Sequence, residues 1–136
     1  MSSLEQTLSI IKPDAVERNL ENEIKNIFLN NGFKIIKDKK IHITKEEAED
    51  FYKVHQTKSF YNDLCGYLSS GPIVVMILEK EDAILGNRKI MGATDPKKAE
   101  EGTIRKKFGI SIDKNSVHGS DSLENAKIEI SFFFKD

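Results

Sequence analysis

The spacing of apolar and polar residues predicts a strand, a helix and a second strand in the first third of the chain. Residues 4–12, LEQTLSIIK, have a β-branched apolar centre and predict a strand that ends before Pro13. Apolar residues recur at helical spacing over 19–32, and Gly32 is typical of a helix C-terminus. The run at 33–43 mixes isoleucines with polar residues and predicts a long strand.

The middle of the chain predicts two helices and a buried strand. Thr44 and Glu47 have the spacing of a capping box, which predicts the start of a helix that runs through Val54. A second short helix is expected at 59–71, where it ends at a Gly-Pro pair. The almost wholly apolar run at 73–79, IVVMILE, has the length of a strand and predicts a place in the middle of a sheet.

The last third of the chain combines two predicted helices with one long irregular stretch. A helix is expected over 81–92, followed by irregular chain with one helical turn from Gly92 to Asn115. A short strand near Ser116 and a final helix capped by Asp121 complete the order. Alternating strands and helices predict an α/β sandwich in which helices pack on a sheet. So long a loop before Ser116 is unusual in a small domain unless it has a function.

The composition is that of one globular domain that spans residues 1–136. Hydrophobic residues make up 38% of the sequence and charged residues 32%, which excludes a disordered chain. The longest apolar run, at 73–78, is too short to cross a bilayer, and the N-terminus lacks the pattern of a secretory signal. Cys65 is the sole cysteine, which excludes an internal disulfide. We therefore expect a cytoplasmic protein without a membrane partner.

The net charge of −1 argues against a dedicated nucleic-acid or membrane binder, but the charge is unevenly distributed. The segment from Asn87 to Lys107 carries a net charge of +4, and the rest of the chain carries −5. A local basic segment on a slightly acidic protein suits a small anionic ligand better than a long polyanion.

Several residues in and near this segment suit phosphoryl transfer, which needs fixed cations and a nucleophile that carries the group. Arg88 and Arg105 suit the first role, because a planar guanidinium binds two phosphate oxygens at once. Lys12, at the end of a predicted strand and followed by proline, presents a third cation from a rigid position. Thr94 and Asn115 add neutral groups that suit hydrogen bonds to phosphate or sugar.

His118, in the polar segment NSVHGSDS, is the candidate nucleophile. A neutral imidazole has a free lone pair near neutral pH, and a carboxylate partner keeps the proton on the other ring nitrogen. Glu129, Asp121 and Glu124 are all candidates for that partner, and their spacing does not choose between them. The alternative for His118 is an ordinary solvated side chain in a polar loop.

A metal-binding role suits the histidines less well. His42, His55 and His118 lack the short spacing of metal ligands, and Cys65 has no partner cysteine. We therefore expect no metal site formed by the protein's own side chains.

Four segments of the chain carry a resemblance to a known family. TLSIIKPDAVERN, GPIVVMILE, NRKIMGATDPKKAEEGTIRKKFG and NSVHGSDSLENAKIEISFFF resemble nucleoside diphosphate kinases, in the order and spacing of that family. The resemblance covers nearly the whole chain, and its most specific part is NxxHGSD after GATxPxxAxxGTIR. It implies a ferredoxin-like α/β sandwich with a four-stranded antiparallel sheet. It also implies ping-pong transfer of the terminal phosphoryl of a nucleoside triphosphate, mainly ATP, to a nucleoside diphosphate, which maintains nucleoside triphosphate pools.

The resemblance implies a role for each candidate residue. His118 would become the phosphohistidine, with Glu129 and Ser120 orienting it, Tyr52 beside it and Phe60 stacked on the base. The residues implied to hold the rest of the nucleotide are Lys12, Arg88, Thr94 and Arg105 at the phosphates, with Lys12 and Asn115 at the sugar. Mg²⁺ is expected as a cofactor bound through the nucleotide phosphates, because the sequence has no carboxylate cluster typical of a magnesium site. The implied assembly is a homo-oligomer, with a hexamer favoured over a tetramer.

The chain departs from the family pattern at three places. Ser59 stands where the family often has proline, which is expected to loosen the lip of the base pocket without removing Phe60. Asp95 replaces the usual asparagine in GATDP and is expected to be tolerated. The sequence ends at Asp136, without the longer tail of some members that braces subunit contacts, so hexamer and tetramer both stay open.

Two functions of other classes are the alternatives. Ferredoxin-like sheets also form RNA-binding domains, but these need exposed aromatic residues on central strands, and IVVMIL contains none. A family member that has lost activity and serves as an interaction protein is the second alternative, although every position required for the chemistry is present.

Overall fold

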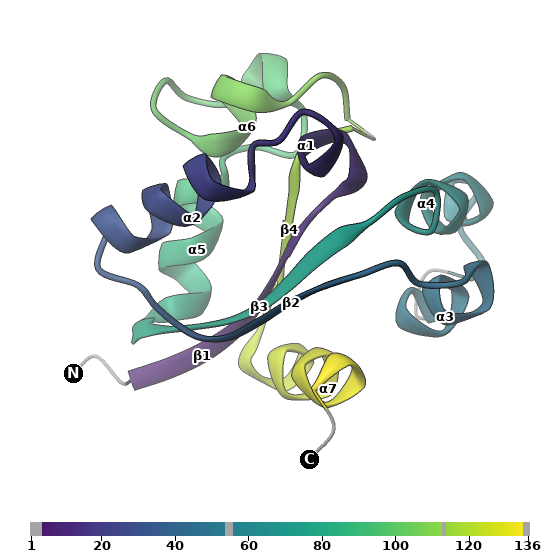
Figure 1. Cartoon of the computed structure of the whole chain (residues 1–136), viewed down its shortest axis with the longest axis horizontal. Coiled ribbons are helices and arrows are strands. Elements are labelled where there is room, and N and C mark those ends of the chain that lie inside the picture. The colour runs from purple at the N-terminus through teal and green to yellow at the C-terminus, as the bar shows by residue number, and fades with distance from the viewer. Residues whose placement is uncertain (1–3, 54–55, 113, 135–136) are drawn as a thin grey trace.

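Four strands form one antiparallel sheet in the order β2-β3-β1-β4 (Figure 1). The computed structural model describes residues 4–53, 56–112 and 114–134. The strands are β1 (Leu4–Ile11), β2 (Lys34–Ile41), β3 (Ile73–Glu81) and β4 (Val117–Gly119). All three neighbouring pairs run antiparallel, and β3 lies inside the sheet. The antiparallel sheet implied by the resemblance and the central place of the IVVMILE strand are both confirmed.

Helices cover both faces of the sheet, as the predicted sandwich requires. Helices α2 and α5 lie on one face, and α3, α4 and α7 lie on the other (Figure 1). The order of strands and main helices is the ferredoxin-like βαββαβ pattern, with α3 and α4 inserted before β3 and α6 inserted before β4. The helices are α1 (Pro13–Glu17), α2 (Glu21–Asn30), α3 (Lys45–Phe51), α4 (Tyr61–Leu68), α5 (Ala83–Met91), α6 (Ile104–Phe108) and α7 (Leu123–Phe133), with a short 3-10 helix, η2 (Pro96–Lys98).

Strand β3 contributes to two hydrophobic cores, one on each face of the sheet. Met76 and Leu78 pack into the core under α2 and α5, where Phe28 is also fully buried. Ile73 and Val75 pack into the core under α3, α4 and α7. Because both faces are covered, the strand is almost continuously apolar rather than alternating. Each fully buried side chain of this size contributes about 1.5–3 kcal/mol relative to exposure.

Several local sequence signals act as predicted. The side chain of Thr44 accepts a hydrogen bond from the backbone N–H of Glu47, and the Glu47 side chain accepts from the N–H of Thr44, which completes the capping box of α3. Gly32, just beyond α2, has a φ of 86° that favours glycine. The irregular stretch before β4 contains α6 where one helical turn was expected.

Helices α2, α4 and α5 are each a few residues shorter than predicted, and the ends of α3 and α7 differ as well. Helix α3 ends at Phe51 with Tyr52 as its C-cap, so it is shorter than predicted, and Val54 lies outside the described residues. Asp121 is not the cap of α7: Ser122 is, because its hydroxyl accepts from the backbone N–H of Asn125 three residues later. Asp121 instead accepts a hydrogen bond from the side-chain amide of Asn125 at 2.6 Å.

Helix α1 was not expected from the sequence. Pro13 occupies its first position, where proline's fixed φ and missing N–H are tolerated. The helix is too short to show an apolar period, and it turns the chain directly after β1. No helix among the described residues combines the length and the apolar character needed to cross a membrane.

Candidate active site

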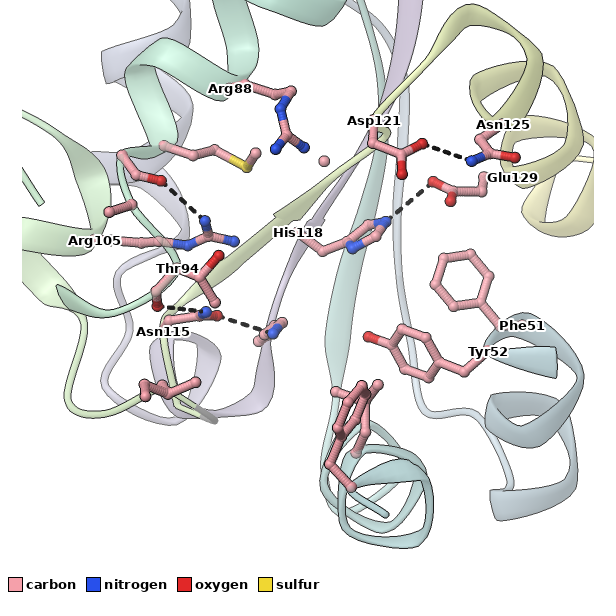
Figure 2. A pocket seen from close by; sticks show the side chains of 18 of the residues that line it. Phe51, Tyr52, Arg88, Thr94, Arg105, Asn115, His118, Asp121, Asn125 and Glu129 are labelled. Atoms are coloured by element: carbon pink, nitrogen blue, oxygen red, sulfur yellow. Dashed lines mark hydrogen bonds and ion pairs between the residues drawn. The ribbon is translucent and has the colours of Figure 1, made fainter. Parts of the chain in front are cut away.

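Nine of the ten predicted site residues line one cavity of about 700 Å³. His118 on β4 lies between two groups of side chains, with Arg88, Thr94, Arg105 and Asn115 on one side and Glu129, Phe51 and Tyr52 on the other (Figure 2). The tenth predicted residue, Ser120, does not line the cavity but lies buried behind Glu129. The fold therefore brings together residues that are spread from position 12 to position 129 of the chain.

The His118 ring is held by a carboxylate, as the candidate nucleophile requires. Its Nε2 atom lies 3.0 Å from Oε1 of Glu129, on α7. The same oxygen accepts a hydrogen bond of 2.8 Å from the hydroxyl of Ser120, whose own oxygen accepts from the backbone N–H of Leu8. A carboxylate oxygen only accepts, so Nε2 is the donor, and in the neutral ring Nδ1 carries the free lone pair. Of the three carboxylates left open by the sequence, the structure pairs Glu129 with the histidine.

Aromatic rings cover the side of His118 next to α3. The ring of Phe51 lies 5.4 Å from the imidazole, and the ring of Tyr52 lies 6.4 Å away, both edge to face. Burial raises the pKa of the Tyr52 hydroxyl well above its ordinary value, and the charge of Glu129 adds to the effect. Tyr52 therefore keeps its proton and presents a neutral O–H in the site.

Arg105 is fixed in place by two backbone carbonyls. Its Nη1 donates to the oxygen of Gly92 at 3.0 Å, and its Nη2 donates to the oxygen of Val117 at 2.9 Å. Its Nε is buried and has no hydrogen-bond partner in the described part of the chain. Burial, followed by the positive charge of Arg88, lowers the pKa of Arg105 to about 10, which keeps it charged at neutral pH. Because the two carbonyls are neutral, they leave the positive charge of Arg105 able to attract an anion.

Lys12, Asn115 and Thr94 form a hydrogen-bonded chain at the other end of the cation group. The Nζ of Lys12, directly after β1, donates to Oδ1 of Asn115 at 2.9 Å. The amide nitrogen of Asn115 donates to the backbone oxygen of Thr94 at 3.1 Å. Lys12 is buried, and this hydrogen bond holds its ammonium group at the wall of the cavity.

Arg88 and Phe60 lie at more exposed parts of the cavity wall. Arg88, on α5, points into the cavity (Figure 2), and its guanidinium makes no hydrogen bond or ion pair with another described residue. Phe60, the N-cap of α4, is 47% exposed, with Leu64 and Ile112 lining the same cavity. An exposed aromatic face at the edge of a basic cavity suits a flat, uncharged ring system.

The described residues contain no group of three or more histidine, cysteine or carboxylate side chains that could hold a metal ion. His42 donates from Nε2 to the backbone oxygen of Ser69, and His55 lies outside the described residues. The carboxylates that line the cavity, Asp121 and Glu129, already accept hydrogen bonds from Asn125 and from His118 and Ser120.

Two contributors to the site were missed by sequence reasoning. Phe51 packs on the imidazole, and the sequence signal was its place next to Tyr52 in the predicted helix. Gly92 supplies a carbonyl to Arg105, and its φ of 87° together with a close approach to Thr103 requires glycine. A single glycine in a long predicted loop gave no indication of that contact.

Comparisons with known proteins agree with this geometry. A sequence model of the family described as nucleoside diphosphate kinase matches residues 5–136, which is nearly the whole chain. The chain belongs to the nucleoside diphosphate kinase family. Its alternating sandwich, its long loop before β4 and its histidine beside two arginines thus belong to a member of that family.

Relatives and solved structures of nucleoside diphosphate kinases match over almost their full length. The nucleoside diphosphate kinase of Campylobacter jejuni is 58% identical over 132 residues, which cover 97% of this chain and 96% of that protein. The one from Wolinella succinogenes is 57% identical over 131 residues, 96% of each chain. A crystal structure of the Aquifex aeolicus nucleoside diphosphate kinase has a TM-score of 0.96 at 42% identity and covers 98% of this chain and 96% of that one.

Proposed function

We propose that this chain is an enzyme that transfers the terminal phosphoryl group of a nucleoside triphosphate, mainly ATP, to a nucleoside diphosphate. The proposal rests above all on one observation: the Nε2 atom of His118 is hydrogen-bonded to Glu129. This leaves Nδ1 as a nucleophile in a cavity that is also lined by the positively charged side chains of Lys12, Arg88 and Arg105. Membership of the nucleoside diphosphate kinase family supports the same activity. A shared histidine would serve the donor and the acceptor in turn.

In the first half-reaction, the lone pair of Nδ1 forms a bond to the terminal phosphorus, and the bond from phosphorus to the bridging oxygen breaks. The nucleoside diphosphate leaves with that electron pair. The proton stays on Nε2, where Glu129 stabilises the positive charge that grows on the ring. In the second half-reaction, a terminal oxygen of another nucleoside diphosphate forms a bond to the phosphorus, and the bond from phosphorus to Nδ1 breaks. Its electron pair returns to Nδ1, so His118 is neutral again and a nucleoside triphosphate leaves.

The cations are proposed to hold the phosphates through this exchange. Arg105 and Arg88 would contact phosphate oxygens, and Thr94 would add a neutral hydrogen bond. Lys12 would contact phosphate and, with Asn115, the sugar hydroxyls. This assignment is supported by the hydrogen bond between Lys12 and Asn115 and by the tethering of Arg105 to two carbonyls. Phe60 would stack on the base, which discriminates little because every base has a π face.

We propose that Mg²⁺ enters the cavity with the nucleotide. Mg²⁺ keeps several waters and binds through substrate phosphates more often than in all-protein sites. The chemistry it supplies there is neutralisation of phosphate charge. The carboxylates of Asp121 and Glu129 already accept hydrogen bonds from other side chains. This supports a Mg²⁺ ion that arrives bound to the nucleotide rather than one held by the protein alone.

A homo-oligomer in the cytoplasm completes the proposal, with a hexamer favoured and a tetramer as the second possibility. Family membership supports the assembly. Exposed apolar side chains, among them Ile110 and Leu85, support further burial between copies. The single cysteine, Cys65, supports a reducing compartment. Sedimentation at micromolar concentration distinguishes the two oligomers, and a stable monomer would contradict the proposed assembly.

Steady-state kinetics test the proposed activity. A single histidine that serves both substrates predicts parallel lines in double-reciprocal plots. His118→Ala is expected to abolish transfer while nucleotide binding, measured by calorimetry, stays close to that of the wild type. Intersecting lines, or transfer by His118→Ala at the wild-type rate, would contradict the mechanism.

A further inference from the structure

The carboxylate of Asp14, in α1, joins three separate parts of the chain. The hydroxyl of Tyr67, in α4, donates to its Oδ1 at 2.5 Å, and that hydroxyl oxygen accepts from the backbone N–H of Asp14 at 2.7 Å. The hydroxyl of Ser116, directly before β4, donates to Oδ2 at 3.1 Å. Arg18 donates to the same Oδ2 at 3.2 Å. All of these groups lie outside the cavity that contains His118.

This arrangement is unusual for a group whose only role is stability. Asp14 is only 4% exposed, and a buried carboxylate is unfavourable unless its oxygens are hydrogen-bonded, as they are here. Apolar residues of similar volume often stabilise a fold as well as or better than a buried polar network. Burial and the hydrogen bond to Asp14 both raise the pKa of the Tyr67 hydroxyl, so the hydroxyl remains a donor.

Ser116 has a backbone conformation that needs such support. Its φ is 73°, in the left-handed region that residues other than glycine rarely adopt. Its carbonyl accepts from the backbone N–H of Lys12 at 2.8 Å, and the carbonyl of the preceding Asn115 accepts from the N–H of Val117 at 2.9 Å. The strained residue thus lies in the turn that presents Asn115 to Lys12 and leads directly into the strand of His118.

The other end of the network reaches the opposite wall of the cavity. Tyr67 belongs to α4, whose N-cap is Phe60 and whose residue Leu64 also lines the cavity. Asp14 therefore links the helix at the proposed base end to the turn at the proposed sugar and phosphate end. Asp14 itself does not line the cavity.

We propose that Asp14 is a positioning residue: through Tyr67 and Ser116 it holds Asn115 and Lys12 in the geometry that contacts the nucleotide sugar. The inference rests on the proposed function, because it assigns a consequence to the sugar contacts of that function. Release of the Ser116 hydroxyl would let the turn relax from its left-handed conformation, which moves Asn115 relative to Lys12. A displacement of about 1 Å at such a contact is enough to slow a reaction by up to about a hundredfold.

The test compares transfer to an ordinary nucleoside diphosphate with transfer to its 2′,3′-dideoxy analogue, which lacks both sugar hydroxyls. Tyr67→Phe removes the hydroxyl that donates to the Asp14 carboxylate and accepts from the Asp14 backbone N–H. We expect kcat/KM for the ordinary acceptor to fall about tenfold and that for the dideoxy acceptor to fall much less. The acceptor ratio, which is kcat/KM for the ordinary acceptor divided by kcat/KM for the dideoxy acceptor, therefore decreases. A merely structural role would lower the thermal midpoint and leave the ratio unchanged.

Two further variants sharpen the test. Tyr61→Phe is the matched control, because it also removes one hydroxyl of α4, which donates to the backbone oxygen of Glu49 away from Asp14. We expect it to keep the wild-type ratio. Ser116→Ala is a second route to the same effect, because it removes the hydroxyl that donates to Asp14 and keeps the left-handed strain, so the turn is free to relax. We expect it to reduce the ratio as Tyr67→Phe does.

The outcomes separate this inference from the proposed function. An unchanged acceptor ratio in Tyr67→Phe and Ser116→Ala would overturn the positioning role alone. An equal change in the Tyr61→Phe control would also overturn it, because the effect would then follow from any lost hydroxyl of α4. A wild-type chain that transfers no phosphoryl to either acceptor would overturn the proposed function and this inference with it.

Discussion

Replacement of Glu129 by glutamine removes the charge beside the proposed nucleophile and keeps the shape of the side chain. Oε1 of Glu129 lies 3.0 Å from Nε2 of His118 and also accepts from the hydroxyl of Ser120. A glutamine carbonyl oxygen in the place of Oε1 can still accept from both donors but carries no charge, and in the flipped orientation the NH₂ group would face the imidazole N–H. The variant therefore loses the electrostatic stabilisation of the ring and no longer fixes its tautomer.

The expected loss follows from the distance and the burial. Two unit charges 3.0 Å apart, at an effective dielectric constant of about 20, interact by about 5.5 kcal/mol. With about half a positive charge on the imidazole in the transition state, the carboxylate contributes about 2.7 kcal/mol, which is roughly a hundredfold in rate. Both side chains are about one-fifth exposed, so solvent screening is limited. We expect kcat to fall about a hundredfold, within a range of roughly ten- to a thousandfold.

Rapid-quench measurement of phosphoenzyme formation from labelled ATP reports this step directly. Nucleotide affinity, measured by calorimetry, should change little, because Glu129 lies on the far side of His118 from the cations (Figure 2). Glu124→Gln is the matched control: it makes the same change on the same helix, at an exposed position. Wild-type rates in Glu129→Gln would refute the reasoning. A loss of rate in Glu124→Gln instead would show that Glu129 is not the carboxylate that acts on His118.

Three further predictions follow from the same structure. Phe60→Ala should raise KM roughly 5- to 150-fold for purine and pyrimidine diphosphates alike, since stacking contributes about 1–3 kcal/mol per base; a rise for one base only would contradict simple stacking. Removal of Mg²⁺ with a chelator should abolish transfer, Mg²⁺ should restore it, and tightly held metal in dialysed, nucleotide-free protein would contradict delivery on the nucleotide. Gly92→Ala should lower the free energy of unfolding by about 2 kcal/mol, because φ is 87° and the new Cβ would lie 2.6 Å from Oγ1 of Thr103. Gly66→Ala, inside α4 with open space at the Cβ position, should raise the free energy of unfolding by about 0.5–1 kcal/mol. Urea titrations measure both variants, and a Gly66→Ala variant less stable than Gly92→Ala would contradict the packing.

The elements that the sequence predicts best are those whose signal is local. The capping box at Thr44, the glycine stop at Gly32 and the apolar run of β3 each depend on a few neighbouring residues, and each is confirmed. Pairing of strands is a long-range property, so the antiparallel order came from the family resemblance and not from the spacing. The cap of α7 was assigned one residue too early, because Asp121 and Ser122 are both good capping residues and only the geometry selects one.

The candidate site shows the same division between local and long-range signals. His118 stood out because a histidine in a run of small polar residues is conspicuous, but its partner could not be chosen from three nearby carboxylates. Pairing with Glu129 depends on how α7 packs on the sheet against β1, which no spacing rule contains. Asp14 and Gly92 were missed for a related reason: their contacts, with Tyr67 and Ser116 and with Arg105, join residues far apart in the sequence.

The position of phosphate on the protein tests the central claim most directly. The wild-type chain is incubated with labelled ATP and Mg²⁺ without an acceptor, and the protein-bound phosphate is located by mass spectrometry and its nitrogen identified by phosphorus NMR. The hydrogen bond between Glu129 and Nε2 predicts one acid-labile, alkali-stable phosphate on Nδ1 of His118 that a nucleoside diphosphate removes. Protein that carries no phosphate, or phosphate on Nε2 or on another residue, would contradict the account.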